Sequence, residues 1–571
     1  MKERTGYPSI DKPQKKYYKK KPVRELNTNQ TMYRMVFDSN KDNMDWHAIS
    51  YMKKEFTYAE LKKMVDKAAN SFAEDGIREG DVILVGLSNT PEAIISLLAL
   101  NKIGAISKWF DIRASKSTIE EYIDQNNCKY IIALDLLIER VKNTKQIDRV
   151  KKVYVVSPVE MLGAPFRAFY RLKSGIRIQK NQKYIFFKDL LSRNAKDAIE
   201  SKYNREKPAI MIQSSGTTGK PKVIIHSNYS ASSAVKKLSY SDLPIQKHKI
   251  LLDLLPPWIA YAIGNAILYP LALGCKVILS PTFEPDAIMS YIGKFTVSMA
   301  APFHYRYLRD HYEKVNRKEK KKFNNSAECF ISGGDKITVE ENKEFENIFK
   351  IPVINGYGNN EGWGCLTVNS VEHNHYGSVG IPKYNDVIVA WDVNDKKELP
   401  YKQVGEICAS TDTMFLRYGN SEEDASSVKQ MHPDGKVWLH TGDLGYIDED
   451  GFVYLEGRMR RVIVRRGFKI SAYTIEDKIT EHIAVKECVT IQVRDREEEH
   501  VPMAFIVMEE GYQEEGVRTE IENKCKNEMK EYEIPKYFKF VSDLPYTSNG
   551  KYDFRRLEEK GEEIVSYLER N

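Results

Sequence analysis

The stretch SSGTTGKPK, from Ser214 to Lys222, is the most informative segment of the chain. Four hydroxyl side chains, two glycines and two lysines are the groups with which a loop holds a phosphate anion. The apolar run AIMIQ (209–213) precedes it and KVIIHS (222–227) follows, so we expect a loop between two strands. Gly216 and Gly219 would let the backbone turn its N–H groups toward the anion.

The spacing of this loop excludes a Walker-type NTPase. A Walker loop has four residues between its glycines, and a Ser or Thr follows its lysine. Here only two residues separate Gly216 from Gly219, and Lys220 is followed by Pro221, which has no hydroxyl for magnesium. The sequence therefore predicts a phosphate loop of another type, with a plain polar turn as the alternative.

Short apolar strands alternate with helices on both sides of the loop. The run 81–87 is nearly all apolar, and 91–105 follows with helical spacing, a Pro at its start and a Gly near its end. A further strand is expected at 129–135. This alternation predicts α/β layers with largely parallel sheets.

The texture changes after about residue 460, where short strands mix with helices rich in Glu and Lys. We expect a large N-terminal multi-layer α/β domain, residues 1–459, and a smaller, mobile C-terminal α+β domain, residues 460–571. A chain of 571 residues is long enough for two such cores.

Charge and cysteine content limit the class of protein. The 87 Lys and Arg against 80 Asp and Glu give a net charge of +7, which is too modest for a dedicated nucleic-acid binder. The seven cysteines form no CxxC pair, and the charged N-terminus does not resemble a signal peptide. We therefore expect reduced thiols, no zinc site and a cytoplasmic location.

Two segments raise the question of a membrane. Residues 254–275 contain no charge, but three prolines and Asn265 favour a buried helix, followed by a strand at 276–280, over a transmembrane span. Residues 159–180 alternate aromatic and aliphatic with basic side chains. We expect a surface helix of a soluble domain there, and an interfacial helix with weak peripheral membrane contact is the alternative.

Six further motifs occur in order along the chain: FTYAELKKMV (56–65), ISGGDKI (331–337), NGYGNNEG (355–362), GEI (405–407), HTGDLGYIDEDGFVYLEGR (440–458) and LPYTSNGK (544–551). Together with the phosphate loop they resemble the adenylate-forming superfamily, which comprises acyl-CoA synthetases, peptide-synthetase adenylation domains and luciferases. The resemblance covers nearly the whole chain and is greatest to an acyl-CoA ligase.

This resemblance implies an AMP-forming acid–thiol ligase. It would use ATP and Mg²⁺ to activate a carboxylic acid as an acyl adenylate, release pyrophosphate, and pass the acyl group to the thiol of coenzyme A. Both reactants of the first step are anionic, so the site must neutralise charge. The resemblance assigns that catalytic task to Lys551, Glu361 and Thr218, with Glu361 as the metal ligand.

The family pattern also assigns the nucleotide contacts. Asp443 would hold the ribose hydroxyls, which takes two acceptor oxygens on one group. Tyr357 would stack on adenine and Asn355 would bond its amino edge. The full set of expected cofactor-binding residues is Ser214, Ser215, Gly216, Thr217, Gly219, Lys220, Lys222, Asn355, Tyr357, Asn360, Asp443, Arg458 and Gly467, the last passing close to pantetheine.

Several positions depart from the family pattern. Asn360 replaces the usual Thr, and Arg460 stands at the hinge position where relatives carry Asp or Lys. Ala472 and Thr474 replace a common Pro and Glu. The phosphate contact of Asn360 is the one that these differences affect most directly.

An acyl pocket is expected between 256–265 and 356–365, walled by Trp258, Tyr261, Phe303 and Trp363. Such a wall suits a fatty or aromatic acid, and ordinary core packing is the alternative. Two other functions stay open: a stand-alone adenylation enzyme that loads a carrier-protein phosphopantetheine, and a non-catalytic nucleotide-binding scaffold. The sequence makes no prediction of oligomeric state.

Overall fold

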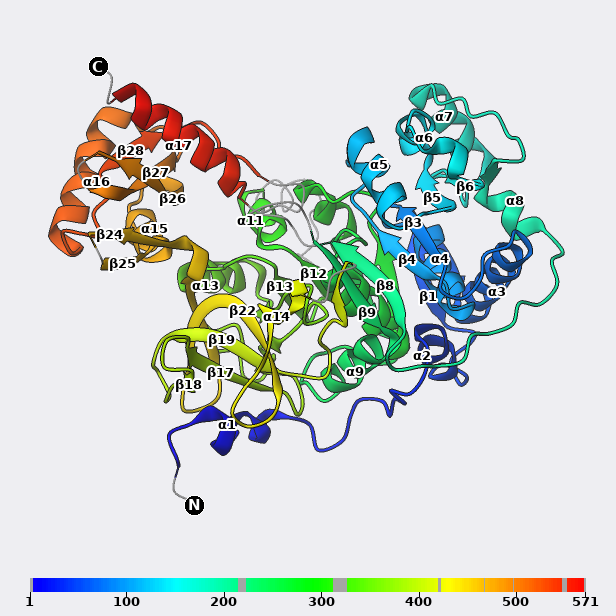
Figure 1. Ribbon diagram of the computed structural model, residues 1–571, viewed down its shortest axis with the longest axis horizontal. Coiled ribbons are helices and arrows are strands. Elements are labelled where there is room, and N and C mark those ends of the chain that lie inside the picture. Colours follow the sequence, from blue (N-terminus) through cyan, green and yellow to red (C-terminus); the bar gives the residue numbers. More distant parts are fainter. Residues whose placement is uncertain are drawn as a thin grey trace.

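The computed structural model describes residues 4–213, 222–311, 326–419, 423–466, 468–496, 498–546 and 552–568. Three sheets form the N-terminal part, and a smaller unit follows them (Figure 1). The α/β layers predicted from the sequence are confirmed.

The first sheet has eight strands in the order β20-β9-β8-β4-β3-β5-β6-β7. The strands from β8 to β7 run parallel, while β9 and β20 pair antiparallel. Their bounds are β3 Val82–Gly86, β4 Ile106–Trp109, β5 Tyr130–Leu134, β6 Lys152–Val156, β7 Tyr184–Phe186, β8 Pro208–Gln213, β9 Val223–Ser227 and β20 Arg417–Tyr418. The expected phosphate loop therefore connects β8 and β9, as an antiparallel pair allows.

The second sheet has nine strands in the order β16-β15-β14-β13-β12-β10-β11-β1-β2. Five neighbouring strands, β14 to β11, run parallel, so their carboxyl ends meet along one edge. Their bounds are β1 His47–Tyr51, β2 Lys54–Thr57, β10 Ile250–Asp253, β11 Lys276–Leu279, β12 Val297–Ala300, β13 Cys329–Gly333, β14 Val353–Tyr357, β15 Thr367–Val368 and β16 Ile381–Pro382.

Helices cover these sheets. Three of them, α3, α9 and α13, begin with a complete capping box, from Thr57 with Glu60, from Ser227 with Ser230 and from Thr338 with Glu341. The principal helices are α2 Met32–Asp38, α3 Tyr58–Glu74, α4 Pro91–Lys102, α5 Lys116–Gln125, α6 Ile138–Lys142, α7 Ala164–Ser174, α8 Phe187–Ser192, α9 Asn228–Leu238, α11 Pro302–Asp310 and α13 Val339–Phe349.

The uncharged segment 254–275 is buried, as expected, but it is not a regular α-helix. It forms a π-helix, η4 Tyr261–Leu268, that continues into α10 Tyr269–Ala272. Pro270, which has no N–H to donate, lies two residues after the end of η4. In the part of the chain that the structure describes, no helix is long and apolar enough to cross a membrane.

The third sheet is antiparallel and contains β17 Val387–Asp392, β18 Lys397–Glu398, β19 Gly405–Ser410, β21 Lys429–Met431, β22 Val437–Ile447 and β23 Val453–Arg458. The short η6, Met459–Arg461, then leads into the C-terminal domain. Its elements are β24 Val462–Arg465, β25 Phe468–Ser471, α15 Ala472–Thr480, β26 Val485–Asp495, β27 Glu499–Met508, α16 Glu514–Glu528, β28 Tyr537–Phe540 and α17 Phe554–Leu568.

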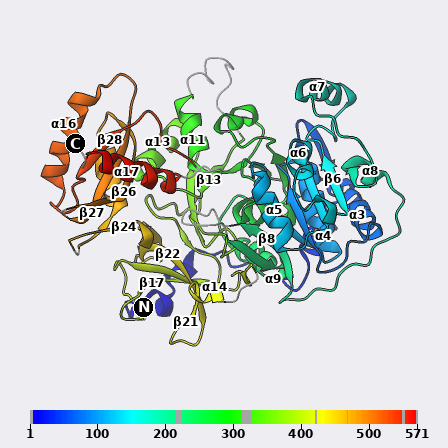
Figure 2. The same cartoon turned by 45° about the horizontal axis from the view of Figure 1, so that its top comes forward.

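The C-terminal domain has hydrophobic cores of its own. Both clusters draw their buried residues only from positions beyond 462, for example Ile475, Ile506 and Val489. The domain lies at one end of the molecule, and the β3–β7 layer lies at the other (Figures 1 and 2). A unit with a separate core is free to move as a body.

Candidate active site

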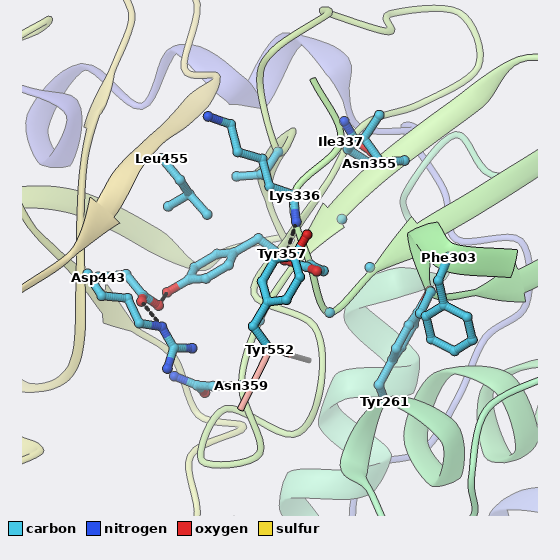
Figure 3. Close-up of a pocket in the computed structure, with 18 of the residues that line it drawn as sticks. Tyr261, Phe303, Lys336, Ile337, Asn355, Tyr357, Asn359, Asp443, Leu455 and Tyr552 are labelled. Atoms are coloured by element: carbon cyan, nitrogen blue, oxygen red, sulfur yellow. Dashed lines mark hydrogen bonds and ion pairs between the residues drawn. The ribbon is translucent and has the colours of Figure 1, made fainter. Parts of the chain in front are cut away.

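A cavity of about 2820 Å³ lies between the second sheet, the third sheet and the C-terminal domain. The carboxyl ends of β13 and β14 open into it, and β22 and β23 form another wall (Figure 3). This edge of parallel strands is where open α/β sheets bind ligands. Tyr357 from the motif at 355–362, and Asp443 and Arg458 from the motif at 440–458, all line the cavity.

Asp443 is the centre of a polar cluster. The hydroxyl of Tyr357 donates to its Oδ2 at 2.5 Å, and Arg458 Nε lies 3.0 Å from Oδ1 (Figure 3). The strand pairing of β22 with β23 sets Asp443 opposite Arg458. The carboxylate raises the pKa of Arg458, and burial raises that of Tyr357, so both stay protonated as donors. A carboxylate has about four acceptor positions, so two ribose hydroxyls still find acceptors.

Strand β22 is irregular just before Asp443, and Glu406 on the neighbouring β19 fixes this irregularity, a role that sequence reasoning missed. Glu406 Oε1 accepts the N–H of Gly442 at 2.9 Å, and Oε2 accepts from His440 Nδ1 at 2.7 Å. Gly442 has φ +71°, a conformation that few side chains tolerate. A buried acceptor for its N–H therefore fixes the turn before Asp443.

Glu361 sits in the cavity wall, largely buried. The hydroxyl of Tyr418 donates to its Oε1 at 2.8 Å. Burial raises the pKa of Glu361, and the Tyr418 hydrogen bond opposes that shift. A carboxylate is a hard oxygen ligand with acceptor positions to spare, so the residue fits the magnesium that nucleotide chemistry uses.

The side chain of Asn360, which stands where the family usually has Thr, joins two other segments of the chain by hydrogen bonds. Its Nδ2 donates to the backbone oxygen of Gln213 at 2.8 Å, and its Oδ1 accepts the N–H of Ala260 at 3.0 Å. His226 Nε2 lies 2.7 Å from its backbone oxygen. Asn360 thus ties the end of β8, just before the expected phosphate loop, to the segment leading into η4.

The four expected acyl-pocket residues divide into two pairs. Tyr261 and Phe303 line the cavity (Figure 3), whereas Trp258 and Trp363 are not among its lining residues. Trp363 is fully buried, and its ring lies 4.7 Å from that of His226. Other apolar side chains share this wall: the aromatic Tyr269, Phe283 and Tyr307, and Leu238, Leu243, Leu254, Leu255, Ile259, Met299 and Ile331.

Two more expected nucleotide contacts are placed. Asn355 and Lys222 line the cavity, and Lys222 Nζ lies 4.8 Å from the centre of the Tyr418 ring. Arg460, the expected hinge, falls within η6. The other expected contacts lie outside the described residues: Ser214, Ser215, Gly216, Thr217, Thr218, Gly219, Lys220, Gly467 and Lys551.

One group of potential metal ligands lies behind the site. Cys408, His432 and His440 are buried with their ligand atoms within 4.8 Å of one another. The Nδ1 atom of His440 lies 3.4 Å from Cys408 Sγ. The Nε2 atom of His440 lies 2.9 Å from the Nε2 atom of His432. Because these partners meet opposite nitrogens of one ring, a single ion does not bind all three. The group is better described as a hydrogen-bonded chain ending on Glu406.

Comparison with known proteins gives the family. Residues 36–419 match the model of the AMP-binding enzyme family, and residues 474–551 match that of the AMP-binding enzyme C-terminal domain. The chain therefore belongs to the AMP-binding enzyme family. It is an adenylate-forming enzyme, most like the acyl-CoA ligases, as its motifs predicted.

Individual relatives agree with this assignment. A long-chain-fatty-acid–CoA ligase of Bacillus subtilis (strain 168) is 27% identical over 544 residues, which cover 93% of this chain and 95% of that protein. 4-Coumarate–CoA ligase 4 of Arabidopsis thaliana is 24% identical over 526 residues, which cover 89% of this chain and 87% of that protein. The fold matches that of the anthranilate CoA ligase AuaEII in complex with anthranoyl-AMP, with a TM-score of 0.81, 19% identity, and 95% and 99% of the two chains covered.

Proposed function

We propose that this enzyme joins a fatty acid to coenzyme A through an acyl adenylate, with ATP and Mg²⁺. The observation that carries the proposal is the composition of one cavity. A polar wall of Asp443, Tyr357, Arg458 and Glu361 suits a nucleotide, and the same cavity continues along an apolar wall of aliphatic and aromatic side chains. An ATP site and an apolar site that meet in one cavity suit the activation of a hydrophobic acid.

In the first step a carboxylate oxygen of the acid attacks the α-phosphorus of ATP, and the bond to pyrophosphate breaks. Asp443 would hold the ribose and Arg458 would add fixed positive charge beside it. Glu361 would hold Mg²⁺, which when bound offsets the charge of the phosphate oxygens. We assign to Lys551 and Thr218 the stabilisation of the charge that develops between the two anions.

In the second step the thiol of coenzyme A attacks the acyl carbonyl, and AMP leaves. We propose that the C-terminal domain rotates about Arg460 between the steps, so that Gly467 borders the pantetheine arm. The separate core of this domain is consistent with such a rotation.

The aliphatic side chains of the cavity suit a fatty acid. Trp258 and Trp363, expected around the acid, do not line the cavity, and leucine, isoleucine and methionine side chains share its apolar wall with Tyr261, Phe303 and three other aromatic rings. Flexible methylene chains pack well against such a surface. The long-chain-fatty-acid–CoA ligase of Bacillus subtilis named above, at 27% identity, supports the same acid class.

The test is a product analysis by mass spectrometry. The purified chain is incubated with ATP, Mg²⁺, coenzyme A and a mixture of fatty acids of graded length with aromatic acids. We expect fatty acyl-CoA and AMP. Acyl adenylate without a thioester would indicate a carrier protein as acceptor instead, and an aromatic acyl-CoA alone would refute the acid class.

A variant separates the two steps. Lys551→Ala should lower the rate of adenylate formation at least about 100-fold, the range seen when a charge-stabilising donor is removed. It should leave the conversion of preformed acyl adenylate to acyl-CoA intact. The control is Lys560→Ala, an exposed lysine on α17. Unchanged adenylation in Lys551→Ala would contradict the assigned role.

A further inference from the structure

Helix α7, Ala164–Ser174, presents an apolar face to solvent. None of its residues is buried, and the exposed fractions are 57% for Phe166, 66% for Phe169 and 85% for Leu172. Residues three apart lie on the same side of a helix, so these three side chains form one continuous strip. Figure 2 shows α7 projecting from the edge of the N-terminal part, near α6.

The side of the helix that faces the protein holds Tyr170, whose ring packs on the main hydrophobic core, and the partly buried Arg167. The hydroxyl of Tyr170 donates to Asp135 Oδ1 at 2.9 Å, and Arg167 donates to the backbone oxygen of Leu162 at 2.7 Å. Leu136, next to Asp135, is itself 54% exposed. A surface helix of a soluble protein normally turns its apolar side inward, so α7 has the reverse orientation. Its apolar strip must have another partner.

The sequence segment that contains α7 carries basic residues and no acidic ones. From Met161 to Lys188 the sequence contains no Asp or Glu, and it contains seven basic residues: Arg167, Arg171, Lys173, Arg177, Lys180, Lys183 and Lys188. Arg171, Lys173 and Arg177 are exposed, and none has an ion pair within the described ranges. The preceding acid, Glu160, is buried and bonded to Lys188.

We propose that α7 and this basic segment dock the enzyme on the surface of an anionic lipid membrane. Phe166, Phe169 and Leu172 would enter the interface, while the arginines and lysines would contact lipid phosphates. An anionic lipid surface matches this combination, because its apolar interior accepts the apolar strip and its phosphates attract the basic side chains. A second copy of this chain would bring the same positive segment and be repelled.

Docking would place the enzyme on the surface where its substrate collects, because the fatty acid proposed above partitions into membranes. This consequence rests on the proposed function, but lipid binding itself does not, because it requires neither ATP nor catalysis. Binding and activity can therefore fail independently.

The experiment is flotation of the full-length protein with two kinds of vesicle, phosphatidylcholine alone and phosphatidylcholine with phosphatidylglycerol. We expect binding to the anionic vesicles that weakens as salt is raised. Basic residues near such a surface contribute about 1 kcal/mol each, so the charge reversal R171E/K173E/R177E should weaken binding at least about 100-fold. F166S/F169S/L172S should weaken it at least about tenfold.

Matched controls keep the test decisive. Ile483→Ser removes a side chain that is 80% exposed on the C-terminal domain, and K63E/K526E/K560E reverses three exposed lysines elsewhere. Both controls should retain vesicle binding, and all variants should retain activity on a short, soluble acid. The proposal is overturned if the wild-type protein floats with neither vesicle, as an acidic protein partner would predict, or equally with both. It is also overturned if the α7 variants bind like their controls.

Discussion

At the scale of single residues, Glu361 depends on a partner 57 positions away. The Tyr418 hydroxyl is its hydrogen-bond donor inside a largely buried wall. Burial raises the pKa of Glu361, and a hydrogen bond to the ionised form lowers it again. Tyr418 therefore helps to keep the carboxylate charged, which a role in holding Mg²⁺ requires.

The first prediction concerns the pH dependence of this pair. Activity should fall as pH drops through the raised pKa of Glu361, because the protonated acid no longer binds a cation. Tyr418→Phe removes a hydrogen bond that favours the ionised form, so the acid limb of kcat/KM for ATP should move to higher pH. The limb in Tyr512→Phe, an exposed site, should match wild type. An unmoved limb in Tyr418→Phe would show that Glu361 does not limit activity.

Asn360 gives a second prediction, on stability. Asn360→Ala would leave the Gln213 oxygen and the Ala260 N–H without their partner. Orphaned buried groups cost about 1–3 kcal/mol each, so the free energy of unfolding should fall by about 2 kcal/mol or more in urea titrations. The control, Asn27→Ala, removes an exposed amide and should change it little. A loss no larger than that of the control would refute the bridge.

These residues show where sequence reasoning succeeds. The motifs themselves gave the positions of Tyr357, Asp443 and Arg458, and the structure places all three on one cavity. The partners Tyr418 and Glu406 have no local signature, because a lone Tyr in a short edge strand and a Glu in "GEI" are common. The bridging role of Asn360 depends on a residue 147 positions away, which only the fold brings close.

At the scale of elements, the strands are easier to predict than the helix beside the acyl site. Apolar runs such as 81–87 and 129–135 read directly as buried parallel strands. The segment 254–275 is apolar on every side, so no periodicity distinguishes the π-helix η4 from an α-helix. Trp258 in this segment and Trp363 in 356–365 were predicted to wall the pocket from their positions beside the site, although neither lines the cavity.

The third prediction concerns the turn at Gly442, an irregularity within β22 where this strand pairs with β19. Glu406→Ala removes the acceptor for the Gly442 N–H and should loosen the turn that presents Asp443. We expect KM for ATP to rise about tenfold, equivalent to about 1.4 kcal/mol, with a smaller effect on kcat. Glu406→Gln keeps an acceptor oxygen and serves as the matched control. Equal KM values in the two variants would assign Glu406 a purely electrostatic role.

At the scale of the whole molecule, few polar contacts between described residues join the C-terminal domain to the rest. Lys336, after β13, places Nζ 2.9 and 2.8 Å from the two carboxylate oxygens of Asp477 on α15. Ser471 donates to the backbone oxygen of Glu456. The sequence predicted a separate C-terminal unit, but its contacts with the larger part required the fold, because Lys336 and Asp477 are exposed charges 141 positions apart.

The last prediction tests whether this ion pair biases the proposed domain rotation. An exposed pair is worth about 0–1 kcal/mol, so breaking it with Asp477→Lys should change the balance between two domain arrangements by at most about fivefold. The measurement is the ratio of the adenylation rate, from pyrophosphate exchange, to the rate of thioester formation in a single turnover. The swapped variant, Lys336→Asp with Asp477→Lys, restores opposite charges and should return the ratio toward wild type. If the swap behaves like the single change, the effect belongs to the individual side chains, and the pair does not control the rotation.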